Sequence, residues 1–484
     1  MSNLKLNKKT TLLIGLAFFA TLMVWQIYNN YAPLILQFLL YDFYKDDPKQ
    51  LLYVVGIIMA LDNIVALIVM PVVGILSDKT KTKWGKRMPY IIVGMLATGI
   101  LFPFIAVCFI YNSLVGVIIF MVLFLVIMQA YRNPVVALMP DVTPKPLRSV
   151  ANGIINFVGY LGAVLATVLG MIFNVKKEGD LAGLVITPKD MSSAQGIMLY
   201  PFLITAVITL VIMLVLTLKL KENKLVLESL KDVEEGEKES QTHASVEKKL
   251  SKSDFKNLIF LILSVFLWFM AFNALETFNS LFALNVIGDS GIASTGVIVL
   301  TAVSILTFLL CGKLASKIGR KRVVIIGISA LIFGFALVAI ATFTFNRGSG
   351  YSNPLTYFLL GSSAIIGFGW ALININSYPM VVELANKDNI GKFTGYYYFG
   401  SMLAQSITPI VVGLIMSFVT IGHIEGIKFL YIYSTLFATI ALVAFLFVKE
   451  AKRNIQAKTG WGALGDPEEN PEEPVAEKVV DSPK

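Results

Sequence analysis

The fold is decided by the stretch Gly74-Ile75-Leu76-Ser77-Asp78-Lys79-Thr80-Lys81-Thr82-Lys83-Trp84-Gly85-Lys86-Arg87, a basic loop between two apolar runs. The runs at 51–76 and 88–110 are each long enough to cross a bilayer, which takes ~20 predominantly apolar residues. The loop carries Lys and Arg close to both membrane ends, and this pattern marks the cytoplasmic side. The stretch therefore predicts two membrane-spanning helices joined on the cytoplasmic side.

A weaker copy of this loop occurs much later, as Gly312-Lys313-Leu314-Ala315-Ser316-Lys317-Ile318-Gly319-Arg320-Lys321-Arg322. The first loop resembles the G-x-x-x-D-x-x-x-x-x-G-[RK]-[RK] signature of the major facilitator superfamily, which that family repeats in its second half. The second copy has Ser316 where the family has an acid. The alternative interpretation is a generic basic loop, but the matching positions of the two copies favour a chain of two related halves.

Composition indicates an integral membrane protein. Of the 484 residues 56% are hydrophobic and 15% are charged, whereas soluble domains carry roughly 25% charged residues. We expect the net charge of +9 to hold cytoplasmic loops against anionic membrane lipid, and we expect no nucleic-acid partner.

Other classes of site lack their residues. Cys108 and Cys311 lie inside apolar runs, and His243 and His423 lie in loops, so the sequence predicts neither a disulfide framework nor a His-based metal site. We expect no cofactor and no enzymatic activity. The basic, then apolar, N-terminus predicts an uncleaved first helix rather than a signal peptide.

The chain predicts an all-α membrane fold of twelve spans in two pseudo-symmetric six-helix bundles. The expected spans are 11–40, 51–77, 88–110, 113–139, 149–174, 198–218, 257–287, 293–314, 322–345, 354–383, 392–420 and 426–448. An even number places both termini on one side, and the charge pattern indicates the cytoplasm. We expect a monomer in the cell membrane.

The domain boundaries follow from composition. We expect an N-terminal bundle at 1–218, a flexible cytoplasmic linker rich in Lys, Glu and Ser at 219–256, a C-terminal bundle at 257–448, and a disordered tail at 449–484. A second repeat supports the two halves, because Asp141 precedes Gly153 by the same spacing as Glu383 precedes Gly395.

Polar side chains inside the spans predict a central site, because lipid-facing surface should be apolar. Several recur at helical spacing and so share a face. The candidate substrate-binding residues are Trp25, Gln26, Tyr28, Asn29, Asn30, Gln129, Arg132, Asn133, Asn156, Tyr160, Trp268, Asn273, Glu276, Trp370, Asn374, Tyr378 and Gln405.

This mixture of amides and aromatic rings suits a neutral, polyhydroxylated solute, because amides both donate and accept hydrogen bonds. A phosphate or dicarboxylate site would need several cations. A drug-type pocket would be more apolar. The alternative for any single amide is a hydrogen bond between helices, worth only ~0.6–2 kcal/mol in membranes.

Three ionisable side chains fall inside spans: Asp62, Arg132 and Glu276. A carboxyl whose protonation changes with access could couple proton movement to solute movement, so Asp62 and Glu276 are the coupling candidates. The alternative is that either is a structural partner of Arg132. A cytoplasmic gate is predicted from the residues Asp78, Arg87, Asp141, Arg148 and Glu383.

Several stretches resemble the sugar branch of the major facilitator superfamily, which includes sucrose–proton and glycoside–cation symporters. They are Pro71–Asp78, Trp84–Ile91, Pro134–Asp141 and Trp268-Phe269. The resemblance implies secondary active, proton-coupled uptake of a disaccharide or glucoside by alternating access.

The sequence also departs from that branch. Leu125 stands near the place of the sucrose symporters' helix-four aspartate, and Ala66 and Met70 stand where melibiose-type symporters have acids. The family's coupling residues therefore do not transfer. A facilitative sugar uniporter and a multidrug exporter remain as alternatives.

Overall fold

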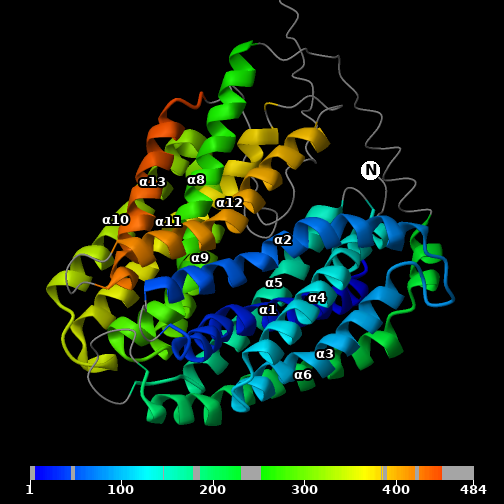
Figure 1. Ribbon diagram of the computed structural model, residues 1–484. Helices are drawn as coiled ribbons and strands as arrows, with labels where there is room; N and C mark the ends of the chain where they lie inside the picture. Colours follow the sequence, from blue (N-terminus) through cyan, green and yellow to red (C-terminus); the bar gives the residue numbers. More distant parts are fainter. Residues whose placement is uncertain are drawn as a thin grey trace, which may run out of the picture.

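The computed structural model describes residues 6–44, 49–144, 147–177, 186–230, 252–382, 384, 390–419 and 425–449 (Figure 1). This part of the chain contains twelve helices long and apolar enough to cross a membrane, as the sequence predicts. They are α1 (Lys8–Tyr41), α2 (Lys49–Lys79), α3 (Met88–Ile110), α4 (Leu114–Val142), α5 (Arg148–Ile172), α6 (Pro188–Lys219), α8 (Lys252–Phe282), α9 (Gly291–Ile318), α10 (Arg320–Thr344), α11 (Pro354–Val382), α12 (Ile390–Phe418) and α13 (Leu430–Leu446).

The start of α6 shows where an apolar pattern falls short. Expected at residue 198, the helix begins at Pro188, where Thr187 and Asp190 form a reciprocal capping box. The extra turns are polar, so a count of apolar residues misses them, while the cap and a proline at the helix start stabilise them.

The expected linker contains a further helix at 222–230, and α8 begins at Lys252. Residues 231–251 of the linker and residues 450–484 of the expected tail lie outside the described residues. The described part of the linker thus packs as structure instead of serving only as a tether.

The two halves repeat the same internal packing. In the first half α3 packs against α4 and α6, α2 against α4, and α1 against α5. In the second half α10 packs against α11 and α13, α9 against α11, and α8 against α12. Each of these pairs in one half corresponds to a pair in the other, six helices apart along the chain, which is the pseudo-symmetry expected of repeated bundles.

The surface of α3 shows how a helix meets lipid. Val93, Leu96, Ile100 and Phe104 recur at intervals of three and four residues and are all exposed. The opposite side of the helix is buried against α4 and α6. An apolar stripe facing outward is the reverse of a soluble helix and suits a hydrocarbon surrounding.

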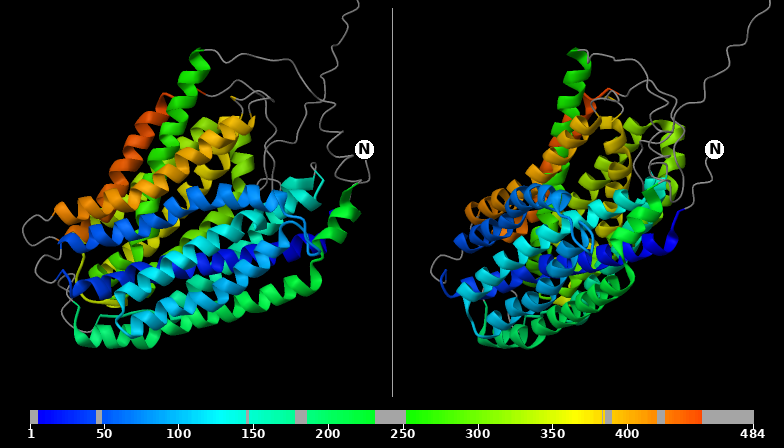
Figure 2. Two further views of the ribbon diagram at one scale, coloured as in Figure 1. Left: turned by 45° about the vertical axis from the view of Figure 1, so that its right-hand side comes forward. Right: turned by 90° about the vertical axis from the view of Figure 1, so that its right-hand side faces the viewer.

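The halves meet along α2 with α12, α5 with α9, and α1 with α8. They lie close together at the end that carries the α5–α6 and α8–α9 connections, here named the clasp end. They spread apart toward the end that carries the α2–α3 loop, here named the basic end (Figures 1 and 2).

Candidate functional site

A cavity of about 20 Å³ lies between the two halves, with room for a single water molecule. It is lined by Trp25 and Asn29 from α1, Met59, Asp62 and Asn63 from α2, Asn273, Glu276 and Thr277 from α8, and Gln405 and Pro409 from α12. Six of these ten residues are ones that the sequence singles out as candidates. The lining therefore brings polar side chains from both bundles to one place.

A hydrogen bond across this cavity joins the halves. The Asn29 amide of α1 donates to Glu276 Oε1 of α8 at 3.3 Å, and Trp25 lines the same cavity. Glu276 is exposed where it lines the cavity. This partner is a donor, which suits a carboxylate.

Arg132 projects from α4 toward the same region. Its guanidinium lies 5.7 Å from the centre of the Trp25 ring, within the range of a cation–π contact. Arg132, Asp62 and Glu276 all belong to the described residues. No guanidinium nitrogen of Arg132 lies within 4.0 Å of an oxygen of either carboxylate. Its charge therefore acts on them at longer range, without a direct ion pair.

Asp62 is paired instead with an amide. Gln129 Nε2 of α4 donates to Asp62 Oδ1 at 3.3 Å, and both side chains are buried, with 0% of Gln129 and 3% of Asp62 exposed. The other end of the amide, Gln129 Oε1, is buried and has no hydrogen-bond partner.

Asn273 brings a second unused group to the site. Only 4% of this residue is exposed, it lines the cavity, and its Nδ2 is buried without a hydrogen-bond partner. A buried amide donor without an acceptor costs free energy, ~1–3 kcal/mol in protein mutants. A ligand hydroxyl or a water entering the cavity would remove that cost.

Other candidates bond to protein and lie outside the cavity lining. The Asn133 amide donates to the Met70 carbonyl at 2.7 Å, and the Asn374 amide donates to the Trp370 carbonyl one turn back at 2.9 Å. Trp370 itself stacks on Phe272 with ring centres 3.8 Å apart. These contacts tie helices and turns together.

The remaining candidates are likewise spread. Tyr378 shares a hydrogen bond with Thr394, Asn156 bonds Asn152, and Asn30 accepts from Ser294 near the clasp end. Tyr28 and Trp268 are fully buried among aromatic rings, Tyr160 is 46% exposed, and Gln26 is partly buried.

At the clasp end the two halves are joined by backbone hydrogen bonds, and residues 174–177 with 288–291 are here named the clasp. Ser290 N donates to the Val175 carbonyl at 2.9 Å, and Lys177 N donates to the Gly288 carbonyl at 3.0 Å. Lys176 and Asp289 form an isolated antiparallel bridge, with Lys176 Nζ 3.9 Å from Asp289 Oδ2.

Buried polar and small residues reinforce the same end. Gln37 of α1 and Asn285 exchange two amide hydrogen bonds, of 2.7 and 3.0 Å, and Asn285 lies in a π-turn (Ala283–Ile287) that ends α8. Gly56 of α2 lies so close to α12 that a Cβ would overlap the Pro409 carbonyl oxygen. Polar bonds and close backbone packing together hold the halves shut here.

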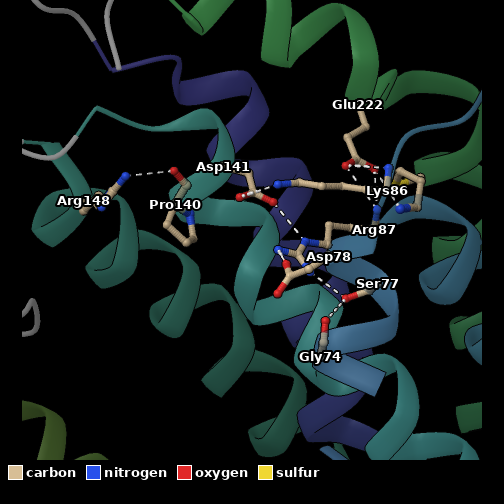
Figure 3. A network of polar contacts seen from close by, with 10 residues as sticks. Gly74, Ser77, Asp78, Lys86, Arg87, Pro140, Asp141, Arg148 and Glu222 are labelled. Carbon is tan, nitrogen blue, oxygen red and sulfur yellow. Dashed lines mark hydrogen bonds and ion pairs between the residues drawn. The ribbon is translucent and has the colours of Figure 1, made fainter. Parts of the chain in front are cut away.

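At the basic end three of the predicted gate residues, Asp78, Arg87 and Asp141, form a charge cluster together with Lys86 and Glu222 (Figure 3). Arg87 bonds Asp141 through Nε at 3.0 Å, pairs with Asp78, and donates to Ser77 Oγ at 2.6 Å. Burial alone would lower the pKa of Arg87, but its hydrogen bonds and charge interactions with Asp141 and Asp78 raise it overall. Arg87 therefore keeps its charge throughout the physiological range.

Glu222 completes the cluster from the helix at 222–230. Its carboxylate accepts the backbone N–H groups of Lys86, Arg87 and Met88 at 3.0, 2.9 and 2.8 Å. These are unpaired donors at the start of α3, where the helix dipole also favours negative charge. Gly85, at φ +118°, passes so close to Glu222 that a Cβ would overlap its carboxylate.

The other two predicted gate residues, Arg148 and Glu383, are not part of the charge cluster. Arg148 donates to the carbonyls of Pro140 and Thr143, at 3.1 and 3.2 Å, and so binds the end of α4 instead of Asp141 (Figure 3). Glu383 lies outside the described residues. The charge cluster is built wholly within the first half and the helix that follows it.

The family described as MFS/sugar transport protein, where MFS is the major facilitator superfamily, matches residues 12–449. The chain belongs to this family. It is accordingly a multi-pass membrane transporter with the major facilitator fold. A search of curated protein sequences finds no match to this chain.

Solved structures of other major facilitator transporters share the fold. A D-xylose–proton symporter superimposes with a TM-score of 0.66 at 14% identity, over 91% of this chain and 98% of that one. A bacterial homologue of the human lysosomal transporter Spinster, inward-facing and occupied, gives 0.62 at 14% over 91% and 96%. The nucleoside transporter NupG gives 0.58 at 17% over 91% and 98%.

Two features of the structure, the capping carboxylate of Glu222 and the clasp, were not predicted from the sequence. Glu222 sits in a stretch rich in Lys and Glu, where no pattern distinguishes a capping carboxylate from a solvated one. The clasp is made by irregular backbone in loops, which has no periodicity to detect. The only advance signal was the run Gly288-Asp289-Ser290-Gly291, which is typical of a turn.

Proposed function

We propose that this transporter takes up a neutral sugar, with a disaccharide or glucoside favoured, in symport with protons. The two halves would give access to the cavity from each side of the membrane in turn. The family description and the shared fold of the D-xylose–proton symporter support this substrate class.

The observation that carries the proposal is the composition of the cavity lining. Amides from both halves, including Asn29, Asn273 and Gln405, surround it beside the Trp25 ring. Asn273 also supplies a buried donor that no protein group uses. Such a lining matches hydroxyl groups better than it matches a lipophilic cation or a phosphate. At about 20 Å³ the cavity must widen before a sugar enters.

Orientation follows from charge. We assign the basic end to the cytoplasm, which places both termini there and the clasp outside, in the cell membrane. The bundles spread apart toward the basic end (Figure 2), and we propose that this conformation is the one that faces the cytoplasm. We propose a monomer as the working unit.

The proposal is tested with purified protein in liposomes, first by a binding screen over radiolabelled mono- and disaccharides. Asn273→Leu should weaken binding of the best sugar ~10-fold, the equivalent of one lost hydrogen bond of ~1.4 kcal/mol. Asn374→Leu is the matched control, because its amide bonds its own helix. Efflux of lipophilic cations without any sugar binding would identify an exporter and overturn the substrate class.

Coupling is tested by imposing a pH gradient across the same liposomes. Uphill accumulation of the sugar should follow the gradient and should vanish in a variant whose coupling carboxyl is neutral, while counterflow survives. Equal uptake with and without the gradient would identify a uniporter.

A further inference from the structure

We infer that Asp62, and not Glu276, is the proton-carrying carboxyl, and that Gln129 positions it in a two-bond acid–amide pair. The inference rests on the proposed proton-coupled function, which leaves both carboxyls as candidates. The geometry around each of them separates the two.

The hydrogen-bond partners of Asp62 suit a protonated acid. Gln129 Nε2 already donates to Asp62 Oδ1, while Gln129 Oε1, on the same planar amide, is buried without a donor. A protonated carboxyl has one O–H donor and retains an acceptor, so it can form both bonds with the amide. An ionised Asp62 offers only acceptors, and the amide oxygen stays unsatisfied. If the Gln129 amide were flipped, its oxygen would face Asp62 in place of its nitrogen. A hydrogen bond between these two oxygens would again require a proton on Asp62.

The hydrogen-bond partner of Glu276 suits a carboxylate. It accepts a hydrogen bond from the Asn29 amide, which can only donate through its nitrogen, and it is exposed toward the cavity. Asp62 is only 3% exposed. An ionised carboxyl that is buried with a single neutral donor is costly, whereas an exposed one with a donor costs less.

Other ionisable groups near Asp62 leave this contrast intact. They are Arg132 of α4, Glu276 of α8 and Tyr28 of α1. Arg132 lies against Trp25 and makes no direct ion pair with Asp62, so no contacting cation holds that carboxyl ionised. From α12, the cavity receives Gln405 and Pro409, neither of which titrates.

The cavity gives the proton a route. It touches both Asp62 and Glu276 and has room for one water. When the halves part, Asp62 releases its proton to cavity water, leaving a carboxylate and a hydronium ion. The acid–amide pair then loses its second bond, so proton release weakens the contact between α2 and α4.

Infrared spectroscopy of the purified full-length protein tests the pair without any substrate. We expect a protonated-carboxyl C=O band at neutral pH that is absent in Asp62→Asn. In Gln129→Met this band should move to higher frequency, because the acid loses its hydrogen-bonded partner. Gln129→Asn is the second variant, for use if Gln129→Met does not fold. It keeps the amide on a shorter side chain and should shift the band in the same direction.

Gln405→Met is the control, since it removes an amide that lines the same cavity but has no hydrogen bond to Asp62, and it should leave the band in place. An Asp62 band that is missing at neutral pH, or unmoved in both Gln129 variants, would overturn the pair. If the band behaves as expected but Asp62→Asn still accumulates sugar under a proton gradient, the proton-carrying role falls while the sugar site stands.

Discussion

The two ends of the molecule are stabilised in opposite ways. At the clasp end the contacts run between the halves, through backbone bonds such as Ser290 to Val175 and through the Gln37–Asn285 amide pair. At the basic end the strongest contacts run within the first half, where Arg87 bonds Asp78 and Asp141. One end therefore closes the molecule, and the other stiffens a single bundle.

The chemistry of each end fits its task. The clasp uses neutral hydrogen bonds and one long, partly exposed ion pair, which are individually weak and can be broken and remade. The charge cluster uses charge-assisted bonds to a buried guanidinium, which are stronger and would be costly to break. A transporter that rocks needs the first kind between its halves and the second kind inside them.

Locking the clasp should have the largest effect. Residues paired across an antiparallel bridge have Cα atoms ~4.5–5.5 Å apart, within the range that a disulfide spans. Oxidation of the double variant Lys176→Cys/Asp289→Cys should therefore abolish sugar transport in liposomes, and a reductant should restore it. The single variant Lys176→Cys, oxidised in the same way, should transport normally. Full activity in the cross-linked protein would show that the clasp does not open during transport.

Removing the charge of Glu222 should destabilise the basic end. Glu222→Gln keeps the size but sets an amide NH₂ against backbone donors and removes a charge from the start of α3. We expect a loss of ~1.5–3 kcal/mol in the free energy of unfolding, the usual range for hydrogen bonds to charged groups. Thermal or denaturant unfolding of the purified protein measures it.

The same helix supplies the control for Glu222. Glu228 pairs with Lys224 at 3.6 Å, but both side chains are more than half exposed. Glu228→Gln should therefore change stability by only ~0–1 kcal/mol. Equal effects of the two substitutions would show that Glu222 does not cap α3 in solution.

The third test crowds the contact between α2 and α12. Gly56→Ala would press a Cβ against the Pro409 carbonyl, and we expect ~1–3 kcal/mol of destabilisation, as for other overpacked sites. The loss should fall on the closed clasp, so a cysteine at the clasp end should become more reactive to an impermeant reagent. Gly196→Ala of α6, with open space around its Cβ, should show neither effect.

The fold followed from sequence because the membrane imposes it. Apolar runs of bilayer length and basic loops are strong, local signals, and all twelve spans were predicted to within a few residues except at the polar start of α6. Polar faces inside spans also pointed to cavity residues such as Asn29, Asn273 and Gln405.

The hydrogen-bond partner of each polar side chain could not be predicted from helical periodicity. Asn29 and Asn133 look alike in sequence, yet one faces Glu276 across the cavity and the other caps a carbonyl of α2. Helical periodicity gives the face, but the neighbouring helix, its register and its own groups decide what each amide meets. Likewise nothing in the sequence distinguished Gln129 as the partner of Asp62.

The smallest expected effect is that of replacing Lys86, one of the two cations that bind the Asp141 carboxylate. Lys86 Nζ lies 3.1 Å from Asp141 Oδ1, but its side chain is 37% exposed, whereas the Arg87 side chain is 7% exposed and also holds Asp78 and Ser77. Water screens the Lys86 pair, so Lys86→Gln should cost only ~0–1 kcal/mol of stability, and high salt should remove the difference from the unsubstituted protein. Arg87→Gln removes a buried guanidinium from the partly buried Asp141, from Ser77 and from the exposed Asp78, and salt should not restore its larger loss. Denaturant unfolding at low and high ionic strength measures both. A Lys86→Gln loss as large as that of Arg87→Gln, and insensitive to salt, would mean that the whole cluster is shielded from water.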